Sequence, residues 1–167
     1  MLPITSLQNP HIKLVKSLED KKSRREHGLF VAEGLNMLER AAACGWDPEL
    51  YLATKPAWIW DAHKPLLVSD KIMSTLSAQN NAHEVLATFK QRWQPRPSKT
   101  GLWLALEDIR DPGNLGTIIR TADAAGADGV ILVGDCCDPY APECVRATTG
   151  SIFAMPLVKM PTVQFVE

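Results

Sequence analysis

The stretch from Leu104 to Gly134, LALEDIRDPGNLGTIIRTADAAGADGVILVG, constrains the fold more than any other part of the chain. It begins inside one short apolar run, Leu102–Leu106, and ends with another, Gly129–Gly134, and both runs have the length of strands. A continuous apolar run is typical of a strand that helices cover on both faces, so we expect both runs to be buried. The stretch therefore predicts a strand–helix–strand unit with parallel strands.

The segment between the two apolar runs predicts a helix. Its side chains repeat at helical spacing, and Gly126 suits the left-handed residue that ends many helices. At its start, the Pro112–Gly113 pair is typical of a tight turn, and the Asn114 side chain is placed to cap the helix. The face that we expect to be buried carries Leu115, Ile118, Ala122 and Ala125.

The loop before this helix argues against the common nucleotide sites. Its glycines, Gly113 and Gly116, are spaced G-x-x-G, whereas a dinucleotide fingerprint needs G-x-G-x-x-G and a P-loop needs GK followed by Ser or Thr. A classical NAD or ATP site is therefore disfavoured. The loop nevertheless follows the carboxyl end of a strand, where open α/β sheets bind their ligands.

Two cationic segments have both a functional and a structural interpretation. Arg120 is either a solvated arginine paired with Asp123 or a fixed cation that contacts a phosphate. In RATTGSIFAMP, Arg146 is followed by Thr148 and Ser151, whose hydroxyls either bind a phosphate or bond to nearby backbone. Spacing alone does not decide between these interpretations.

The chain divides at QPRPSKTG, Gln94–Gly101, whose prolines, glycine and lack of apolar periodicity are typical of a linker. We therefore expect domains at 1–95 and 102–167, with the linker at 96–101. In the first domain, alternating helical and strand patterns predict a small α/β fold. The expected elements are one helix from Pro10 through residue 27, a strand at 28–34, a helix at 35–45, strands at 49–54 and 65–70, a helix capped by Ser69 or Asp70, and a strand or helix at 83–91.

Composition permits a packed core, with 46% hydrophobic and 22% charged residues. The net charge of −1 hides an asymmetry, because residues 1–100 sum to +4 and residues 101–167 to −5. The first part is thus the better candidate for meeting a polyanion, the alternative being ordinary solvated charge. Its candidate contacts are Lys13, Lys16, Lys21, Lys22, Arg24 and Arg25.

Several classes of protein are disfavoured. No apolar run has the length of a membrane span, and the N-terminus lacks the pattern of a secretory signal, so we expect a cytoplasmic protein. Four cysteines without a C-x-x-C pair fit free thiols in a reducing compartment better than a metal site. We expect no bound metal.

LEDIRDPGNLGTIIRTADAAGADGVIL, followed by DPYAPECVRATTGSIFAMPLV, resembles the opening of the SpoU family of RNA ribose 2′-O-methyltransferases, within the SPOUT superfamily. Asn114, Gly116 and Arg120 match the first family motif. FVAEGLNMLERA and LVSDKIMSTLS are similar to the auxiliary substrate-binding domain of the family. The resemblance covers essentially the whole chain. The second and third family motifs, which build the C-terminal knot and most of the S-adenosylmethionine pocket, do not occur in this sequence.

The resemblance implies an α/β fold with a substrate-binding domain and the N-terminal part of an α/β-knot methyltransferase domain, the knot segment missing. It implies transfer of a methyl group from S-adenosylmethionine to a ribose 2′-hydroxyl of tRNA or rRNA, with Arg120 and Asn114 as catalytic residues. Because a guanidinium stays protonated in proteins, Arg120 is expected to stabilise charge on the 2′-oxygen and anchor a phosphate. Residues that hold the cofactor are expected beyond Glu167.

The family forms homodimers largely through knot-region helices, so the resemblance leaves dimerisation of this chain open. Where the incomplete catalytic part lacks neighbouring strands, we expect the two apolar runs to expose apolar surface. Two other functions remain in view. One is a non-catalytic RNA-binding module without a cofactor site, and the other is a small Rossmann-like nucleotide-binding protein, which the glycine spacing disfavours.

Overall fold

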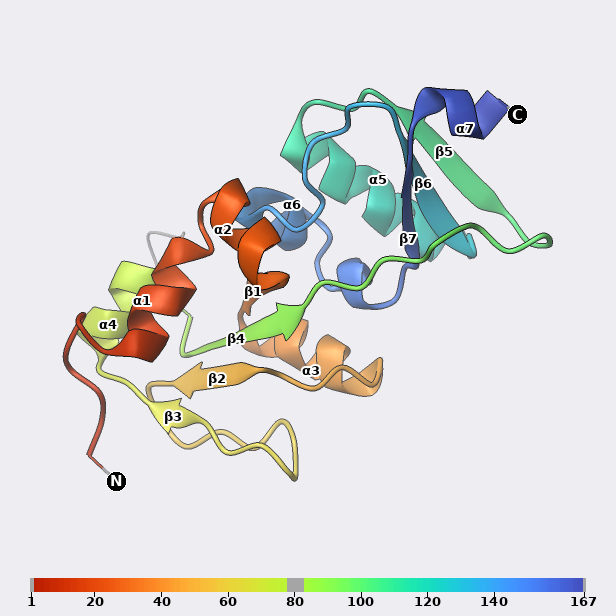
Figure 1. Cartoon of the computed structure of the whole chain (residues 1–167). Coiled ribbons are helices and arrows are strands. Elements are labelled where there is room, and N and C mark those ends of the chain that lie inside the picture. Colours follow the sequence, from red (N-terminus) through yellow and green to blue (C-terminus); the bar gives the residue numbers. More distant parts are fainter. Residues whose placement is uncertain (1, 78–82, 167) are drawn as a thin grey trace. The chain divides into compact units, whose positions relative to one another are not determined.

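The computed structural model describes residues 2–77 and 83–166 (Figure 1). The chain divides into two compact units, residues 1–91 (unit 1) and 92–167 (unit 2). Both units combine helices with a sheet, which confirms the predicted α/β class. The predicted linker at 96–101 lies within unit 2 and stays a prediction.

Unit 1 is built on a four-stranded sheet in which the last strand of the unit lies at the centre. The strand order is β1-β4-β2-β3. β4 pairs antiparallel with both β1 and β2, while β3 pairs parallel with β2. The segment at 83–91, which the sequence left open between strand and helix, contains strand β4. The strands are β1 (Leu29–Glu33), β2 (Leu50–Ala53), β3 (Leu66–Leu67) and β4 (Val85–Lys90).

The helix expected from Pro10 through residue 27 is two helices, which corrects that prediction. The first ends at Ser17, and Asp20 begins the second, because its carboxylate accepts a 3.0 Å hydrogen bond from the Ser23 amide. Ser69, one of the two predicted caps, accepts from Ile72 N and begins the fourth helix. The helices of unit 1 are α1 (Pro10–Ser17), α2 (Lys21–His27), α3 (Leu35–Ala43) and α4 (Asp70–Leu76).

Two groups of side chains form the core of unit 1. An aliphatic cluster joins α1 and α4 to the sheet through fully buried residues such as Ile12, Leu52 and Ile72. Aromatic rings form the second group, in which Phe30 and Phe89 lie 5.8 Å apart between centroids. Trp46 and Trp60 also contact Phe89 edge-on or tilted, as aromatic rings prefer.

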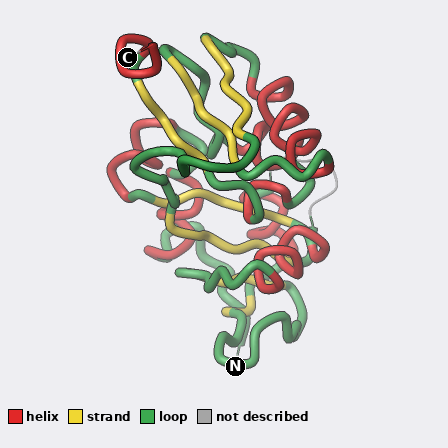
Figure 2. Tube along the Cα trace, turned by 90° about the vertical axis from the view of Figure 1, so that its right-hand side faces the viewer, coloured by secondary structure: helices red, strands yellow, loops and turns green. Residues whose placement is uncertain are grey.

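Unit 2 is a three-stranded parallel sheet in the order β5-β6-β7, whose strands run side by side in Figure 2. The predicted strand–helix–strand unit is confirmed as β5, α5 and β6. Before Pro156 the chain forms a single 3₁₀ turn, and directly after Pro156 it forms the third strand, Leu157–Met160. The elements are β5 (Trp103–Glu107), α5 (Pro112–Ala124), β6 (Gly129–Val133), α6 (Pro142–Ala147), η1 (Ser151–Phe153), β7 (Leu157–Met160) and α7 (Thr162–Val166).

The two apolar strands of unit 2 differ in burial, and each corrects one expectation. β6 is buried along its whole length because it lies between β5 and β7, so it does not expose apolar surface. β5 lies at the edge of the sheet and is not covered on both faces. Leu102 is 62% exposed and Leu104 is 38% exposed. The expectation of exposed apolar surface is therefore confirmed for β5 alone.

The buried face of α5 is rotated from the predicted one. Leu115 and Ala122 are buried as expected, but Ile119 replaces Ile118, and Ala125 is exposed. The rotation follows from Gly116, where α5 packs against α6. A β-carbon at position 116 would stand 2.4 Å from the Cys144 carbonyl oxygen, so only a glycine permits this approach.

Candidate active site and nucleic-acid interface

The loops at the carboxyl ends of β5 and β6 are held to each other by backbone hydrogen bonds. Asp108 adopts a left-handed conformation with φ of 53°, and its carboxylate accepts a 2.8 Å bond from the Asp135 amide. Cys137 N donates to Ile109 O at 2.7 Å. An ion pair between Arg110 and Asp135 lies at the surface of the same loops. This is the end of the sheet where α/β folds bind ligands, as expected from the sequence.

Asp111 caps α5, which corrects the prediction that Asn114 does so. The Asp111 carboxylate accepts a 2.6 Å hydrogen bond from the Asn114 amide, and Pro112 occupies the first helical position. Asn114 is therefore the third helical residue, and its exposed side chain makes no hydrogen bond with the described residues. The signal was present in the sequence, because an aspartate directly before a proline is a helix start.

Arg120 is exposed and makes no ion pair or hydrogen bond with the described part of the chain. The alternative pairing with Asp123 is absent, because Asp123 accepts a 2.6 Å hydrogen bond from the Ser151 hydroxyl instead. Two other residues of α5 contact the segment 144–151. Gly116 packs against Cys144–Thr148, and Asp123 accepts the hydrogen bond from Ser151. Arg120 therefore lies at the edge of the interface between α5 and the segment 144–151, with its cation available to a ligand.

The structure does not bring Asn114 and Arg120 into contact. They are six residues apart on one helix, which places them about 9 Å apart along the axis and about 120° apart around it. Neither side chain bonds to the other. A ligand that meets both must therefore span part of the surface of α5, as a nucleotide with its ribose and phosphate does.

Of the three predicted residues in RATTGSIFAMP, only Arg146 is available to a ligand. It is exposed in the last turn of α6. Thr148 is fully buried and donates a 2.6 Å hydrogen bond to Val145 O, and Ser151 is 7% exposed and bonds to Asp123. The structure therefore does not present Thr148 and Ser151 to RNA as predicted, since both hydroxyls bond inward, to Val145 O and to Asp123.

An apolar groove lies between β5 and α5. Its volume is about 280 Å³, and it is lined by exposed or half-buried side chains that include Leu102, Trp103, Leu104 and Ile118. Trp103 also packs against Gly129 of β6, where a β-carbon would stand 2.2 Å from the ring. The groove offers no charged group, so it does not fit a phosphate.

In unit 1 the six predicted cations fall into two classes. Arg24 is 3% exposed, and its guanidinium donates to Leu18 O at 2.9 Å and to Glu19 O at 2.7 Å. Arg24 therefore joins α2 to the end of α1, and the prediction that it contacts RNA is wrong. The exposed class consists of Lys13, Lys16, Lys21, Lys22 and Arg25.

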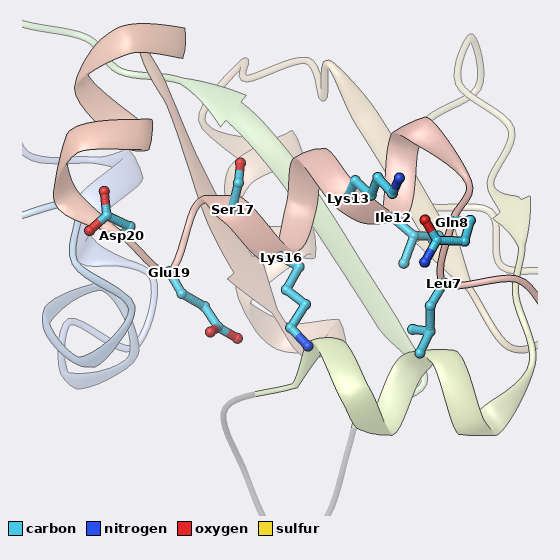
Figure 3. A pocket seen from close by; sticks show the side chains of 8 residues that line it. All are labelled: Leu7, Gln8, Ile12, Lys13, Lys16, Ser17, Glu19 and Asp20. Carbon is cyan, nitrogen blue, oxygen red and sulfur yellow. The ribbon is translucent and has the colours of Figure 1, made fainter.

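Two of the exposed lysines lie at a cavity beside α1. Lys13 and Lys16 line a space of about 560 Å³, in which Leu7 and the buried Ile12 supply apolar surface (Figure 3). The acidic side chains Glu19 and Asp20 lie at its other end, near the start of α2. The cavity thus combines two cations, an apolar wall and hydrogen-bond acceptors.

Neither a metal centre nor a membrane span is present in residues 2–77 and 83–166. No group of three or more histidine, cysteine or acidic side chains there has the geometry to hold an ion. None of the described helices has the length and apolarity needed to cross a bilayer. All four cysteines are free thiols.

Two family models match the chain in sequence order. The MRM3-like substrate binding domain matches residues 9–87, and the SpoU rRNA Methylase family matches residues 101–166. An uncharacterised tRNA/rRNA methyltransferase of Synechocystis is 35% identical over 166 residues, covering 92% of this chain and 60% of the relative. A 23S rRNA (guanosine(2553)-2′-O)-methyltransferase of Bacillus subtilis is 28% identical over 171 residues, covering all of this chain and 68% of the relative.

Solved structures show the same likeness. The crystal structure of an rRNA methyltransferase from Sinorhizobium meliloti superposes with a TM-score of 0.88 at 40% identity, over 99% of this chain and 67% of that one. Its AdoMet-bound form superposes with a TM-score of 0.87. The chain thus spans about two thirds of this protein and 60% of the Synechocystis relative. It belongs to the SpoU family of rRNA methylases.

Proposed function

We propose that this chain serves the transfer of a methyl group from S-adenosylmethionine to a ribose 2′-hydroxyl of tRNA or ribosomal RNA. The family membership supports this proposal, as do the relatives named for rRNA and for 2′-O-methylation. The observation that carries it is the position of Arg120, an exposed guanidinium with no hydrogen bond or ion pair among the described residues, on the helix that carries the family motif. We place this function in the cytoplasm.

Arg120 supplies the positive charge that the reaction needs. A ribose hydroxyl is a weak nucleophile, and negative charge develops on its oxygen as the proton leaves. A fixed guanidinium stabilises that charge and also binds an adjacent phosphate through two parallel hydrogen bonds. Asn114, with its amide exposed near the start of α5, positions the ribose.

The carboxyl-end loops of unit 2 fit a cofactor that carries positive charge. S-adenosylmethionine supplies an electrophilic methyl group on a sulfonium and also carries an ammonium. The loops after β5 and β6 carry Asp108, Asp111 and Asp135, and residues 101–167 sum to a charge of −5. Asp108 and Asp111 accept backbone hydrogen bonds and Asp135 pairs with Arg110, so these carboxylates supply negative potential that favours a nearby sulfonium and are not open ligands for it.

RNA binds through the exposed cations of unit 1 in this proposal. Lys13 and Lys16 border the cavity beside α1, and Lys21, Lys22 and Arg25 extend the cationic surface along α2. Such contacts to phosphates depend on salt because each releases a condensed counterion. The 2′-hydroxyl that receives the methyl group is also the group that separates RNA from DNA.

The test is a transfer assay with S-adenosylmethionine labelled in its methyl group and ribosomal RNA. A methyl group on the 2′-oxygen blocks alkaline cleavage of the following phosphodiester, so the expected product is a labelled, alkali-resistant dinucleotide. Label on a base would contradict the proposal. RNA binding with no transfer would instead favour a non-catalytic RNA-binding module.

A further inference from the structure

The loop between β2 and β3, residues 54–65, presents an aromatic ring to solvent. Trp58 is 68% exposed, although most large aromatic side chains of the chain are buried or half-buried. The exposed ring offers a flat apolar face that a ligand can cover. Trp58 lies outside α1 and α2, the helices that carry the exposed cations of unit 1.

The loop on both sides of Trp58 is fixed to the core of unit 1. Trp60, two residues on, is 7% exposed and donates from its indole nitrogen to Trp46 O at 2.9 Å. Its ring packs against Tyr51 with centroids 5.2 Å apart. The Tyr51 hydroxyl in turn donates to Ala57 O at 3.3 Å. The backbone on both sides of Trp58 is therefore held by the core, which lowers the entropy that ordering the loop around a ligand would cost.

A cation accompanies the exposed ring. The ammonium of Lys64 lies over the Trp58 ring, 6.0 Å from its centroid, at the outer range of a cation–π contact. Lys55, the other lysine of the loop, is engaged by Glu84 at 2.6 Å. Asp61 is the loop's single carboxylate, so the loop carries a charge of +1. Lys64 is therefore the cation that can reach an anion beside Trp58.

An exposed π-face with an adjacent ammonium matches the chemistry of an unpaired nucleotide. Each base has a flat face that stacks on an aromatic ring, and each nucleotide has a phosphate that pairs with a cation. We propose that Trp58 stacks on an unpaired base of the RNA substrate and that Lys64 contacts the neighbouring phosphate. This rests on the proposed function for the identity of the ligand as RNA, and the matched substrate-binding family model includes the loop.

The test uses the full chain and a fluorescein-labelled single-stranded RNA of about ten nucleotides, with a duplex of the same length as a second probe. Trp58→Ala is expected to weaken single-strand binding about tenfold and duplex binding much less, because duplex bases are already stacked. Trp58→Phe keeps a stacking ring and should retain most of the affinity. Lys64→Gln should reduce the dependence on salt, since one phosphate contact is lost.

Leu35→Ala is the matched control, because Leu35 is 51% exposed in the same unit and has no aromatic ring. Its RNA affinity should not change. A direct readout is the indole N–H signal of Trp58 in a ¹H–¹⁵N spectrum, identified among the five tryptophans by its loss in Trp58→Phe. That signal should shift when the single strand is added.

The outcomes separate this inference from the proposed function. Unchanged single-strand affinity in Trp58→Ala, with wild-type chain that binds RNA, overturns the stacking site and leaves methyl transfer untouched. Absent methyl transfer with a Trp58-dependent single-strand affinity overturns the proposed function alone. If Trp58→Ala instead abolishes association with another protein or a second copy and leaves RNA binding unchanged, the ring is a protein contact and the inference is wrong.

Discussion

Gly116 lies so close to Cys144 that a β-carbon on it would stand 2.4 Å from the Cys144 carbonyl oxygen and 2.6 Å from the Ala147 side chain. These distances are below van der Waals contact, and one of them is to backbone. The motif glycine therefore sets the spacing between α5 and α6. Its role is steric, and it fixes where Arg120, one helical turn further on, lies beside the segment 144–151.

Gly116→Ala should destabilise unit 2, because α5 and α6 must move apart to make room for the alanine side chain. Overpacking of this kind costs about 1–3 kcal/mol, which chemical denaturation will measure. Gly113→Ala is the matched control on the same helix. Its β-carbon would meet only side-chain oxygens, the nearer of them Asp111 Oδ1 at 3.3 Å, and alanine favours helix. Equal stability losses in the two variants would contradict the steric role of Gly116.

Asp111→Ala should lower the free energy of unfolding by about 1 kcal/mol, since it removes the side chain that caps α5. Asn114→Ala should change stability much less, because the Asn114 side chain makes no bond with the described residues. Thermal unfolding of the two variants distinguishes the caps. A larger loss in Asn114→Ala would restore the cap that the sequence predicted.

Arg24 and Arg25 are neighbours with opposite expected effects. Arg24→Gln should destabilise unit 1 by at least about 2 kcal/mol, because two carbonyl oxygens lose a buried charged donor. Arg25→Gln should leave stability within about 0.5 kcal/mol. Unlike Arg24→Gln, however, Arg25→Gln should weaken RNA binding and lower the salt dependence of that binding, because an exposed cation is lost. Denaturation and RNA titration of both variants check the pair, and a stable Arg24→Gln would show that the guanidinium is dispensable.

Arg120→Ala should reduce methyl transfer by about two to three orders of magnitude, the usual loss when one charge-stabilising donor is removed. RNA affinity should change less, since the cations of unit 1 are unaltered. Arg96→Ala, which also removes an exposed arginine, is the control and should retain transfer. Kinetics under single-turnover conditions provide the measurement. Equal turnover in Arg120→Ala excludes the assigned role.

Burial raises the pKa of the Cys144 thiol above its ordinary value of 9.0. Above pH 9.0 the unfolded chain therefore loses this proton while the folded chain keeps it, so the free energy of unfolding falls as the pH rises. The window ends at pH 10.0, the ordinary pKa of tyrosine, where tyrosines of the unfolded chain begin to add to the effect. One such group contributes a slope of up to about 1.4 kcal/mol per pH unit. Denaturation across this window should give a shallower slope in Cys144→Ala than in the native chain. Parallel slopes would contradict the effect of burial.

The βαβ part of unit 2 could be predicted because its signals are local. Apolar runs gave the strands β5 and β6, and Gly126, with φ of 73°, follows the end of α5 as expected. The cap could not be assigned as readily, because Asp111 and Asn114 are both good capping residues and only the position of Pro112 decides between them. The prediction that β5 is buried on both faces was also wrong, because an apolar run indicates a strand and does not indicate its place in the sheet.

The candidate site could be predicted only in part, since burial of a cation is a tertiary property. Arg24 and Arg25 are adjacent and chemically identical, yet only the first turns toward the carbonyl groups at the end of α1. Likewise, the hydroxyls of Thr148 and Ser151 carry no local sign that they bond inward. Arg120 could be identified by the family motif, and only the structure shows that it has no hydrogen bond or ion pair within residues 2–77 and 83–166.

The order of strands in unit 1 has a consequence for how the chain folds. β4, the last strand of the unit to be synthesised, lies between β1 and β2, so neither of these can complete its pairing until residues 85–90 have left the ribosome. Pairing over such sequence separations is slow because a long loop must close first. The sheet of the nascent unit therefore stays incomplete until almost all of the unit has been synthesised, and its strand edges remain unpaired for that interval.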